Sequence, residues 1–134
     1  MSGVSDLHEL LSSMDPTLVA GEYVFISLPG VAYGGASHLA PIASFAEREG
    51  MTLIIPKERA DAAAIDCDET FRMITLRVHS SLGAVGLTAA VSRQLARRGI
   101  SANIVAAYYH DHIFVPSSRA DEALLALQQI GTSR

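Results

Sequence analysis

The sequence contains a single cysteine, no tryptophan, and charged residues at only 18% of its 134 positions. The lone cysteine, Cys67, excludes an internal disulfide and a zinc site built from several cysteines. Cys67 also lies between Asp66 and Asp68, and these like charges disfavour the thiolate that a reactive cysteine needs. We therefore expect neither redox chemistry nor a structural metal.

Basic residues and long apolar runs are also scarce. Ten Lys and Arg residues stand against fourteen Asp and Glu residues, a net charge of -4, which leaves little to neutralise a phosphate backbone, so we expect no nucleic acid partner. No stretch approaches the roughly 18 apolar residues of a membrane span. Residues 1–13 carry acids and no basic start before an apolar core, which argues against a secretory signal. We expect a cytoplasmic protein with no membrane partner.

Hydrophobic residues make up 49% of the chain, enough for a sizeable core. Apolar periodicity and the positions of Gly and Pro predict alternating strands and helices. We expect a helix before Pro16, a flexible surface loop from Pro29 to Ala40, and a hairpin turn at His110-Asp111. The expected strands are 22–28, 51–55, 71–79, 100–107 and 113–116, and the expected helices are 41–49, part of 57–69, 84–98 and a last one ending near Ile130.

The chain also contains an internal repeat. Residues 46–55 can be laid without gaps on residues 95–104, and both segments have the pattern of a helix end, a glycine and a strand. We infer two β-α-β units, residues 1–69 and 70–134, of which the second is extended by a hairpin strand and a helix. Units of this size are marginal alone, so we expect their sheets to pack or merge.

The second half resembles an ACT domain. The resemblance rests on the run His79 to Ala89 (HSSLGAVGLTA), which contains Gly86-Leu87, on the turn Gly99-Ile100-Ser101, and on residues 108–116, which are similar to a hairpin of the ACT domains in aspartate kinases and amino-acid sensors. The first half is similar to the same family in its segments Gly21-Glu22-Tyr23-Val24-Phe25 and Glu49-Gly50-Met51-Thr52-Leu53. The whole chain resembles small bacterial tandem-ACT proteins.

The resemblance implies an α+β protein of two ferredoxin-like, ACT-like units with antiparallel sheets. It implies a regulatory protein, commonly a homodimer, that binds an amino acid at interfaces between ACT units, with no catalysis and no cofactor. One departure is visible, because the sequence after Ile130 is too short for the last strand of a ferredoxin-like unit. We expect the first half to donate this strand, so that the two units interleave.

The turn from Ser80 to Gly83 is the predicted centre of the ligand site. It joins a strand to a helix N-terminus, where free backbone N–H groups and the helix dipole favour a carboxylate. Asn103 and Asp111 are candidate polar partners, Asp111 for an α-ammonium group. Ordinary capping and turn formation need the same residue types, so the spacing alone leaves that alternative open. With the resemblance, the candidate ligand-binding residues are His79, Ser80, Ser81, Leu82, Gly83, Val85, Gly86, Asn103, Ile104, Tyr108, Asp111 and His112.

Two other functions are weighed against amino-acid binding. His79, His110 and His112 could form a three-imidazole metal site, but no Glu or Cys completes a metal signature, and we expect no metal. The chain could instead be a structural module, whose edge strands serve only to dimerise or to hold a partner. The motif of a serine nucleophile elbow is absent from the sequence, so we expect no serine catalysis.

Overall fold

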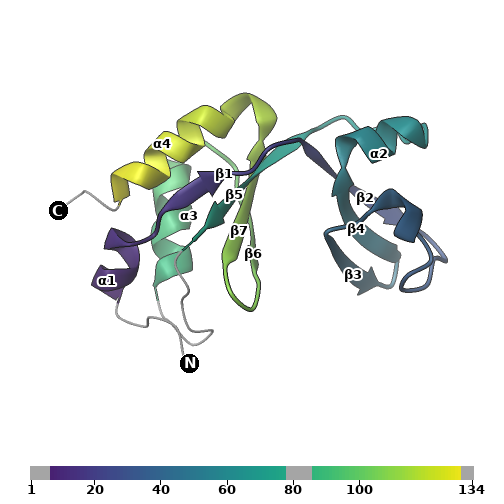
Figure 1. Ribbon diagram of the computed structural model, residues 1–134, viewed down its shortest axis with the longest axis horizontal. Coiled ribbons are helices and arrows are strands. Elements are labelled where there is room, and N and C mark those ends of the chain that lie inside the picture. The colour runs from purple at the N-terminus through teal and green to yellow at the C-terminus, as the bar shows by residue number, and fades with distance from the viewer. Residues whose placement is uncertain (1–6, 78–85, 131–134) are drawn as a thin grey trace. The chain divides into compact units, whose positions relative to one another are not determined.

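The computed structural model describes residues 7–77 and 86–130, which fall into two compact units (Figure 1). Residues 21–71 form one, here called the middle unit, and the described residues of 1–20 and 72–134 form the other, the terminal unit. The expected domains, residues 1–69 and 70–134, stay a prediction. In space, the N-terminal segment belongs with the second half of the chain.

The middle unit is a three-stranded antiparallel sheet with strand order β3-β4-β2. Its strands are β2 (Tyr23–Leu28), β3 (Ala43–Glu47) and β4 (Gly50–Pro56), and the helix α2 (Lys57–Ala62) follows. Alternate residues of β2 and β4 point to one face and form a buried core with the loop after β2 and with α2. That core contains Val24, Ile26, Ala36, Leu39, Met51, Leu53, Ile55 and Ala60.

The helix expected over residues 41–49 is wrong. Pro41 and the following Ala and Glu residues favour a helix start locally, but residues 43–47 form strand β3, in register with β4 from Ala43 opposite Ile54 to Glu47 opposite Gly50. Thr52 Oγ1 also donates a hydrogen bond to the Glu47 carboxylate across the pair. Pairing with a buried strand therefore overrides the helical preference of a short segment.

Gly50 closes this hairpin and is not the helix cap that the repeat suggested. Its φ is +155°, and a Cβ atom placed there would lie 2.9 Å from the backbone nitrogen of Pro29 and 3.0 Å from the carbonyl oxygen of Leu28. Two backbone segments thus approach each other at Gly50 more closely than any side chain allows. The glycine is required by packing.

The terminal unit contains a four-stranded sheet with order β1-β5-β7-β6. Its strands are β1 (Pro16–Leu18), β5 (Phe71–Leu76), β6 (Asn103–Ala106) and β7 (Asp111–Pro116). Strand β1 pairs antiparallel with β5, Leu18 opposite Ile74 and Pro16 opposite Leu76. The segment before β2 thus supplies the strand that the C-terminal half lacks, so the expected interleaving of two ferredoxin-like units is confirmed.

Helices cover one face of the terminal sheet (Figure 1). They are α1 (Leu7–Ser12), α3 (Leu87–Arg97) and α4 (Ala120–Ile130), the last preceded by the short 3-10 turn η2 (Ser117–Arg119). Alternation along β5 places Ile74 and Leu76 on this face, as the sequence predicts, where they meet the buried stripe of α3. The core is formed by Met14, Ile74, Leu76, Leu87, Val91, Leu95, Ile100, Ile113, Val115, Ala120, Ala123, Ala126 and Leu127.

The structure shows a different internal repeat from the one expected. Segment 46–55 lies in a hairpin and segment 95–104 in a helix-to-strand connection, so that alignment is wrong. Instead, Pro56-Lys57-Glu58-Arg59-Ala60-Asp61 matches Pro116-Ser117-Ser118-Arg119-Ala120-Asp121, 60 residues later. Each copy runs from a central strand into the following helix, and each alanine is buried.

The arginine of each copy lies at the start of a helix and donates hydrogen bonds to backbone carbonyls of the β2–β3 or the β5–β6 connection. Arg59 Nη1 donates to the carbonyl of His38, 2.8 Å away. Arg119 Nη2 donates to the carbonyl of Arg98 at 2.8 Å, and its Nη1 to that of Gly99 at 3.3 Å. The C-terminal end of α3 in the terminal unit thus corresponds to the 3-10 turn η1 (Ser37–Leu39) in the middle unit.

Candidate functional site

The predicted ligand residues divide between described and undescribed parts of the chain. His79, Ser80, Ser81, Leu82, Gly83 and Val85 lie outside the described residues. Gly86, Asn103, Ile104, Tyr108, Asp111 and His112 all lie in the terminal unit.

Gly86 is the N-cap of α3. Its φ is +100°, in the left-handed region, where a side chain would be strained. Its carbonyl accepts the first helical hydrogen bond from the Ala90 N–H, at 2.9 Å. The first N–H groups of a helix have no acceptor within it, so the start of α3 offers donors to an anion.

The β6–β7 hairpin turns at Tyr108-Tyr109 and not at His110-Asp111. The Ala107 N–H donates to the carbonyl of His110 across the turn, at 3.1 Å, and Asp111 already pairs with Ala106 as the first residue of β7. The two tyrosines are 69% and 60% exposed and meet edge to face, with ring centroids 4.9 Å apart. Tyr108 is therefore a solvent-facing turn residue.

Asp111 and His112 point to opposite faces of the sheet. Asp111 shares its face with Ile113 and the helices, as Ile104 does on β6, whereas His112 and Asn103 share the other face. Asn103 is exposed and lies opposite Phe114, at the far end of the hairpin from the turn. Of the six predicted residues that the structure describes, Asp111 and Ile104 therefore lie on one face of the sheet and His112 and Asn103 on the other.

His112 Nδ1 and Thr75 Oγ1 are hydrogen-bonded, 2.9 Å apart. This bond joins the start of β7 to the end of β5, where the chain leaves the sheet towards α3. Burial lowers the pKa of His112, and the neighbouring His110 lowers it further. The lowered pKa favours the neutral form of His112. Its hydrogen bond to Thr75 holds the start of β7 against the end of β5.

Asp111 is half-buried, and burial raises the pKa of its carboxyl group, while His112 and His110 act in the opposite direction. Next to it, His110 Nδ1 is buried and has no hydrogen-bond partner among the residues that the structure describes. A buried polar atom without a partner costs about 1–3 kcal/mol. Asp111 and His110 are therefore the two polar groups at this sheet end with capacity for a further partner.

Metal and thiol chemistry find little support. Among residues 7–77 and 86–130, no three His, Cys, Asp or Glu side chains are grouped in a way that could hold a metal ion. Burial raises the pKa of the Cys67 thiol, and the charges of Asp66 and Asp68 raise it further. The sequence indicated the effect of these charges, but not that of burial.

The described helices also include none that is long and apolar enough to cross a membrane.

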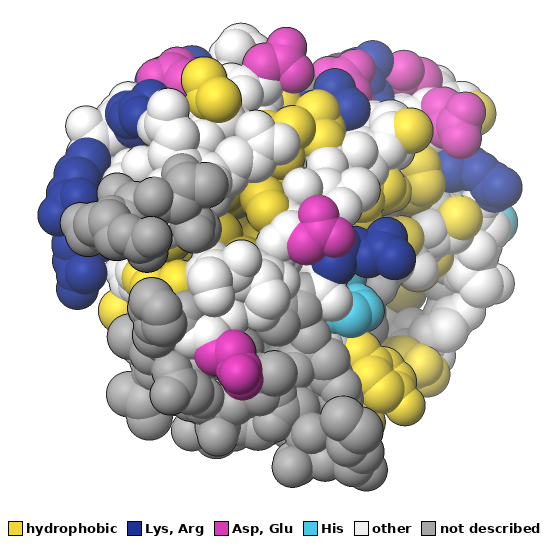
Figure 2. Space-filling view, turned by 60° about the vertical axis from the view of Figure 1, so that its left-hand side comes forward, with side chains coloured by type: hydrophobic (Ala, Val, Ile, Leu, Met, Phe, Trp, Pro, Cys, Tyr) yellow, Lys and Arg dark blue, Asp and Glu magenta, His cyan; other side chains and the backbone are white. Residues whose placement is uncertain are grey.

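Acidic and basic side chains occur on the same face of the molecule, with hydrophobic side chains visible between them (Figure 2). The large exposed hydrophobic residues of the described chain are Tyr33, Ile42, Phe45, Tyr108, Tyr109 and Leu125.

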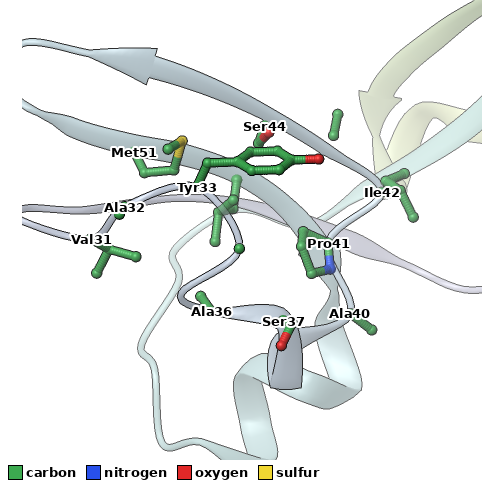
Figure 3. A pocket seen from close by; sticks show the side chains of 13 residues that line it. Val31, Ala32, Tyr33, Ala36, Ser37, Ala40, Pro41, Ile42, Ser44 and Met51 are labelled. Carbon is green, nitrogen blue, oxygen red and sulfur yellow. The ribbon is translucent and has the colours of Figure 1, made fainter.

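A pocket of about 450 Å³ lies in the middle unit, where the sequence predicts only a surface loop (Figure 3). The loop between β2 and β3 forms one wall, and Ser44 of β3 with Met51 and Leu53 of β4 forms the other. Tyr33 lies near Met51 and Ser44 in the close-up.

Comparison with known proteins gives matches along nearly the whole chain. Two family models, both described as ACT domain, match residues 2–72 and residues 68–129. No match was found among the curated proteins.

Several solved structures are similar. A Vibrio cholerae protein of unknown function, described as a possible transport protein, is 53% identical, with a TM-score of 0.81 over 89% of this chain and 91% of that one. An Agrobacterium tumefaciens protein is 14% identical, with a TM-score of 0.63 over 87% of each chain. The ligand-free regulatory subunit of aspartate kinase from Thermus thermophilus is 13% identical, with a TM-score of 0.60 over 89% of this chain and 98% of that one. The last two likenesses concern the fold alone.

Proposed function

The chain belongs to the ACT domain family, with two such domains in tandem, and we propose that it is a regulatory protein that binds a small amino acid in its terminal unit and catalyses no reaction. One observation carries this proposal. Half-buried Asp111 adjoins His110, whose buried Nδ1 has no partner among the described residues, at the sheet end where β5 leaves towards α3.

The proposed roles follow from the charges of an amino acid. An α-ammonium group has three N–H donors and needs acceptors, and the Asp111 carboxylate supplies a charged one. An α-carboxylate needs donors, and the first N–H groups of α3, which have no acceptor within the helix, provide them. In this proposal His112 positions the strand through Thr75 and does not touch the ligand. The undescribed Ser80 to Gly83 turn stays a predicted part of the site.

A homodimer and a cytoplasmic location complete the proposal. Among the described strands, β1, β3 and β6 each have a neighbour on one side only. Such edges present unpaired backbone groups to a second copy. Phe45, on edge strand β3, is 71% exposed, and this favours the second candidate function, a pairing module that needs no ligand.

The test is a thermal-unfolding screen of the full chain against each proteinogenic amino acid. A ligand at 100 times its dissociation constant stabilises the folded state by about 2.7 kcal/mol. Asp111→Asn should weaken binding about tenfold or more, because the ammonium loses its charged acceptor. The matched control is Asp121→Asn on the exposed face of α4, which should leave binding unchanged.

A screen without any shift at millimolar concentrations would contradict amino-acid binding. The pairing module would then be tested by Phe45→Lys, which should dissociate the dimer in light scattering. If Phe45→Lys dissociates the dimer while an amino acid still stabilises the protein, pairing and ligand binding are separate properties of the chain.

A further inference from the structure

The pocket of the middle unit exists because a helix is missing there. In the terminal unit, α3 connects β5 to β6 and covers the sheet with Leu87, Val91 and Leu95. In the middle unit, the connection from β2 to β3 contains only the turn η1, from which a single residue, Leu39, is buried. The loop covers Met51 and Leu53, which are only 8% and 4% exposed, but it leaves a pocket of about 450 Å³ beside them.

The lining of this pocket contains no charged side chain and no histidine. Apolar groups of Val31, Ile42 and Met51 form much of it, and the polar side chains are the hydroxyl groups of Tyr33, Ser37 and Ser44. A carboxylate or an ammonium group buried here would find no opposite charge, which is a large cost. The lining therefore disfavours a free amino acid and favours an uncharged ligand.

The volume and shape of the pocket further restrict the ligands that it can hold. Small-molecule pockets commonly have volumes of about 300–1,000 Å³, so 450 Å³ has room for one ring or two fused rings. Tyr33 is 86% exposed although it lines an apolar hollow. An aromatic ring in this position can stack on a ligand ring and bury its own apolar surface.

We propose that this pocket is a second ligand site, which takes a neutral aromatic or alicyclic ring compound with a polar group no larger than a hydroxyl or an N–H. The two ACT units then bind compounds of different charge, a zwitterion in the terminal unit and a neutral ring compound in the middle unit. The second site rests on its own lining and does not depend on the first.

The experiment titrates the full chain with indole and, separately, with L-tryptophan, which carries the same ring on a charged backbone. Binding is followed through the methyl resonance of Met51 and the ring resonances of Tyr33 in NMR spectra. We expect indole to shift both residues and to bind about tenfold or more tightly than L-tryptophan, because the zwitterion must be desolvated. Shifts caused by an amino acid in the terminal unit appear at Asp111 and Gly86, so the two proposals can fail separately.

Two variants report on the pocket itself. Tyr33→Ala removes a mostly exposed ring and should weaken indole binding about tenfold without loss of the fold. Ser44→Phe places a ring in the pocket and should abolish binding, whereas Ser101→Phe, at an exposed position of the terminal unit, should not change it.

Three results would overturn the proposal. They are the absence of any shift at about 10 mM indole, equal affinities for indole and L-tryptophan, and unchanged binding in both pocket variants.

Discussion

At the scale of single residues, the start of β7 carries two adjacent ionisable groups with opposite behaviour. Burial raises the pKa of the Asp111 carboxyl and lowers that of the His112 imidazole. In both cases burial favours the uncharged form. Because strand alternation sends the two side chains to opposite faces, Asp111 is available to a ligand on the helix side, while His112 is held by Thr75 on the other.

The lowered pKa of His112 makes stability depend on pH. Below the ordinary histidine pKa of about 6.5, unfolded chains bind a proton at His112 that folded chains do not, so the free energy of unfolding should fall as the pH falls through this range. His112→Asn, which can still hydrogen-bond to Thr75, should reduce this dependence. Urea unfolding between about pH 5 and pH 8 measures it.

The control is His38→Asn, because His38 is exposed in the middle unit and its removal should leave the pH dependence unchanged. If His112→Asn keeps the full dependence of the unmodified chain, burial at His112 is not its cause.

The sequence could predict part of the candidate site. Gly86 and Asp111 became candidates because a strand, a turn and a helix start have recognisable residue types. Asn103 was a second candidate polar contact of the ligand, and one strand alone could not show that the pairing register puts it opposite Phe114, on the other face of the sheet from Asp111. The buried nitrogen of His110, which has no partner among the described residues, and the pocket beside Met51 depend on packing, and the sequence alone does not indicate either.

At the scale of helices and strands, pairing with a neighbouring strand determined the structure where the local sequence is compatible with either a helix or a strand. Residues 43–47 contain good helix formers, yet they form β3 because β4 offers a buried strand to pair with. The strongly patterned elements β5, α3 and α4 were predicted correctly, because their apolar periodicity matches a single face. The missing helix of the middle unit could not be inferred, since a glycine-rich loop gives no sign of what it covers.

Gly50 tests the close packing of the start of β4 against the end of β2. Gly50→Ala places a Cβ atom about 3 Å from the backbone of Leu28 and Pro29, whereas Gly34→Ala at φ +83° meets open space. Both variants strain the backbone, and Gly50→Ala adds a clash with the neighbouring backbone. We expect Gly50→Ala to cost about 1–3 kcal/mol more than Gly34→Ala in urea unfolding, and equal costs would contradict the close approach.

The repeated arginine tests the correspondence of the two units. Arg119→Ala removes hydrogen bonds to two carbonyls and a surface ion pair with Glu122, and it should destabilise the protein by about 1–2 kcal/mol, because the guanidinium is only partly buried. Arg59→Ala removes one bond on the surface and should cost about 0.5–1 kcal/mol. Exposed Arg93→Ala is the control, within about 0.5 kcal/mol. A cost for Arg119→Ala no larger than this control would mean that the carbonyl contacts contribute nothing.

At the scale of the whole molecule, the terminal unit is assembled from both ends of the described chain. Strand β1 supplies an edge to β5, and Leu18 packs against the core that α3 and α4 share. The sequence indicated that a strand was missing and where it could come from, because the family pattern fixes the number of strands. Which three residues supply it required the structure.

Leu18→Asp tests this interleaving. A carboxylate at the edge of the terminal core should destabilise the unit by about 1–3 kcal/mol and speed amide hydrogen exchange in α3 and α4. Ala20→Asp, at an exposed position nearby, should have little effect. Unchanged exchange in both helices of Leu18→Asp would mean that β1 does not stabilise the terminal unit.

The central claim is that the terminal unit binds an amino acid next to Asp111. The most direct measurement is an NMR titration of the isotope-labelled full chain with each proteinogenic amino acid at about 10 mM. The account predicts that one amino acid, or a few related ones, shifts the amide resonances of Gly86, His110 and Asp111 but not that of Asp121. Spectra that stay unchanged with every amino acid, or that change only outside this sheet end, would contradict it.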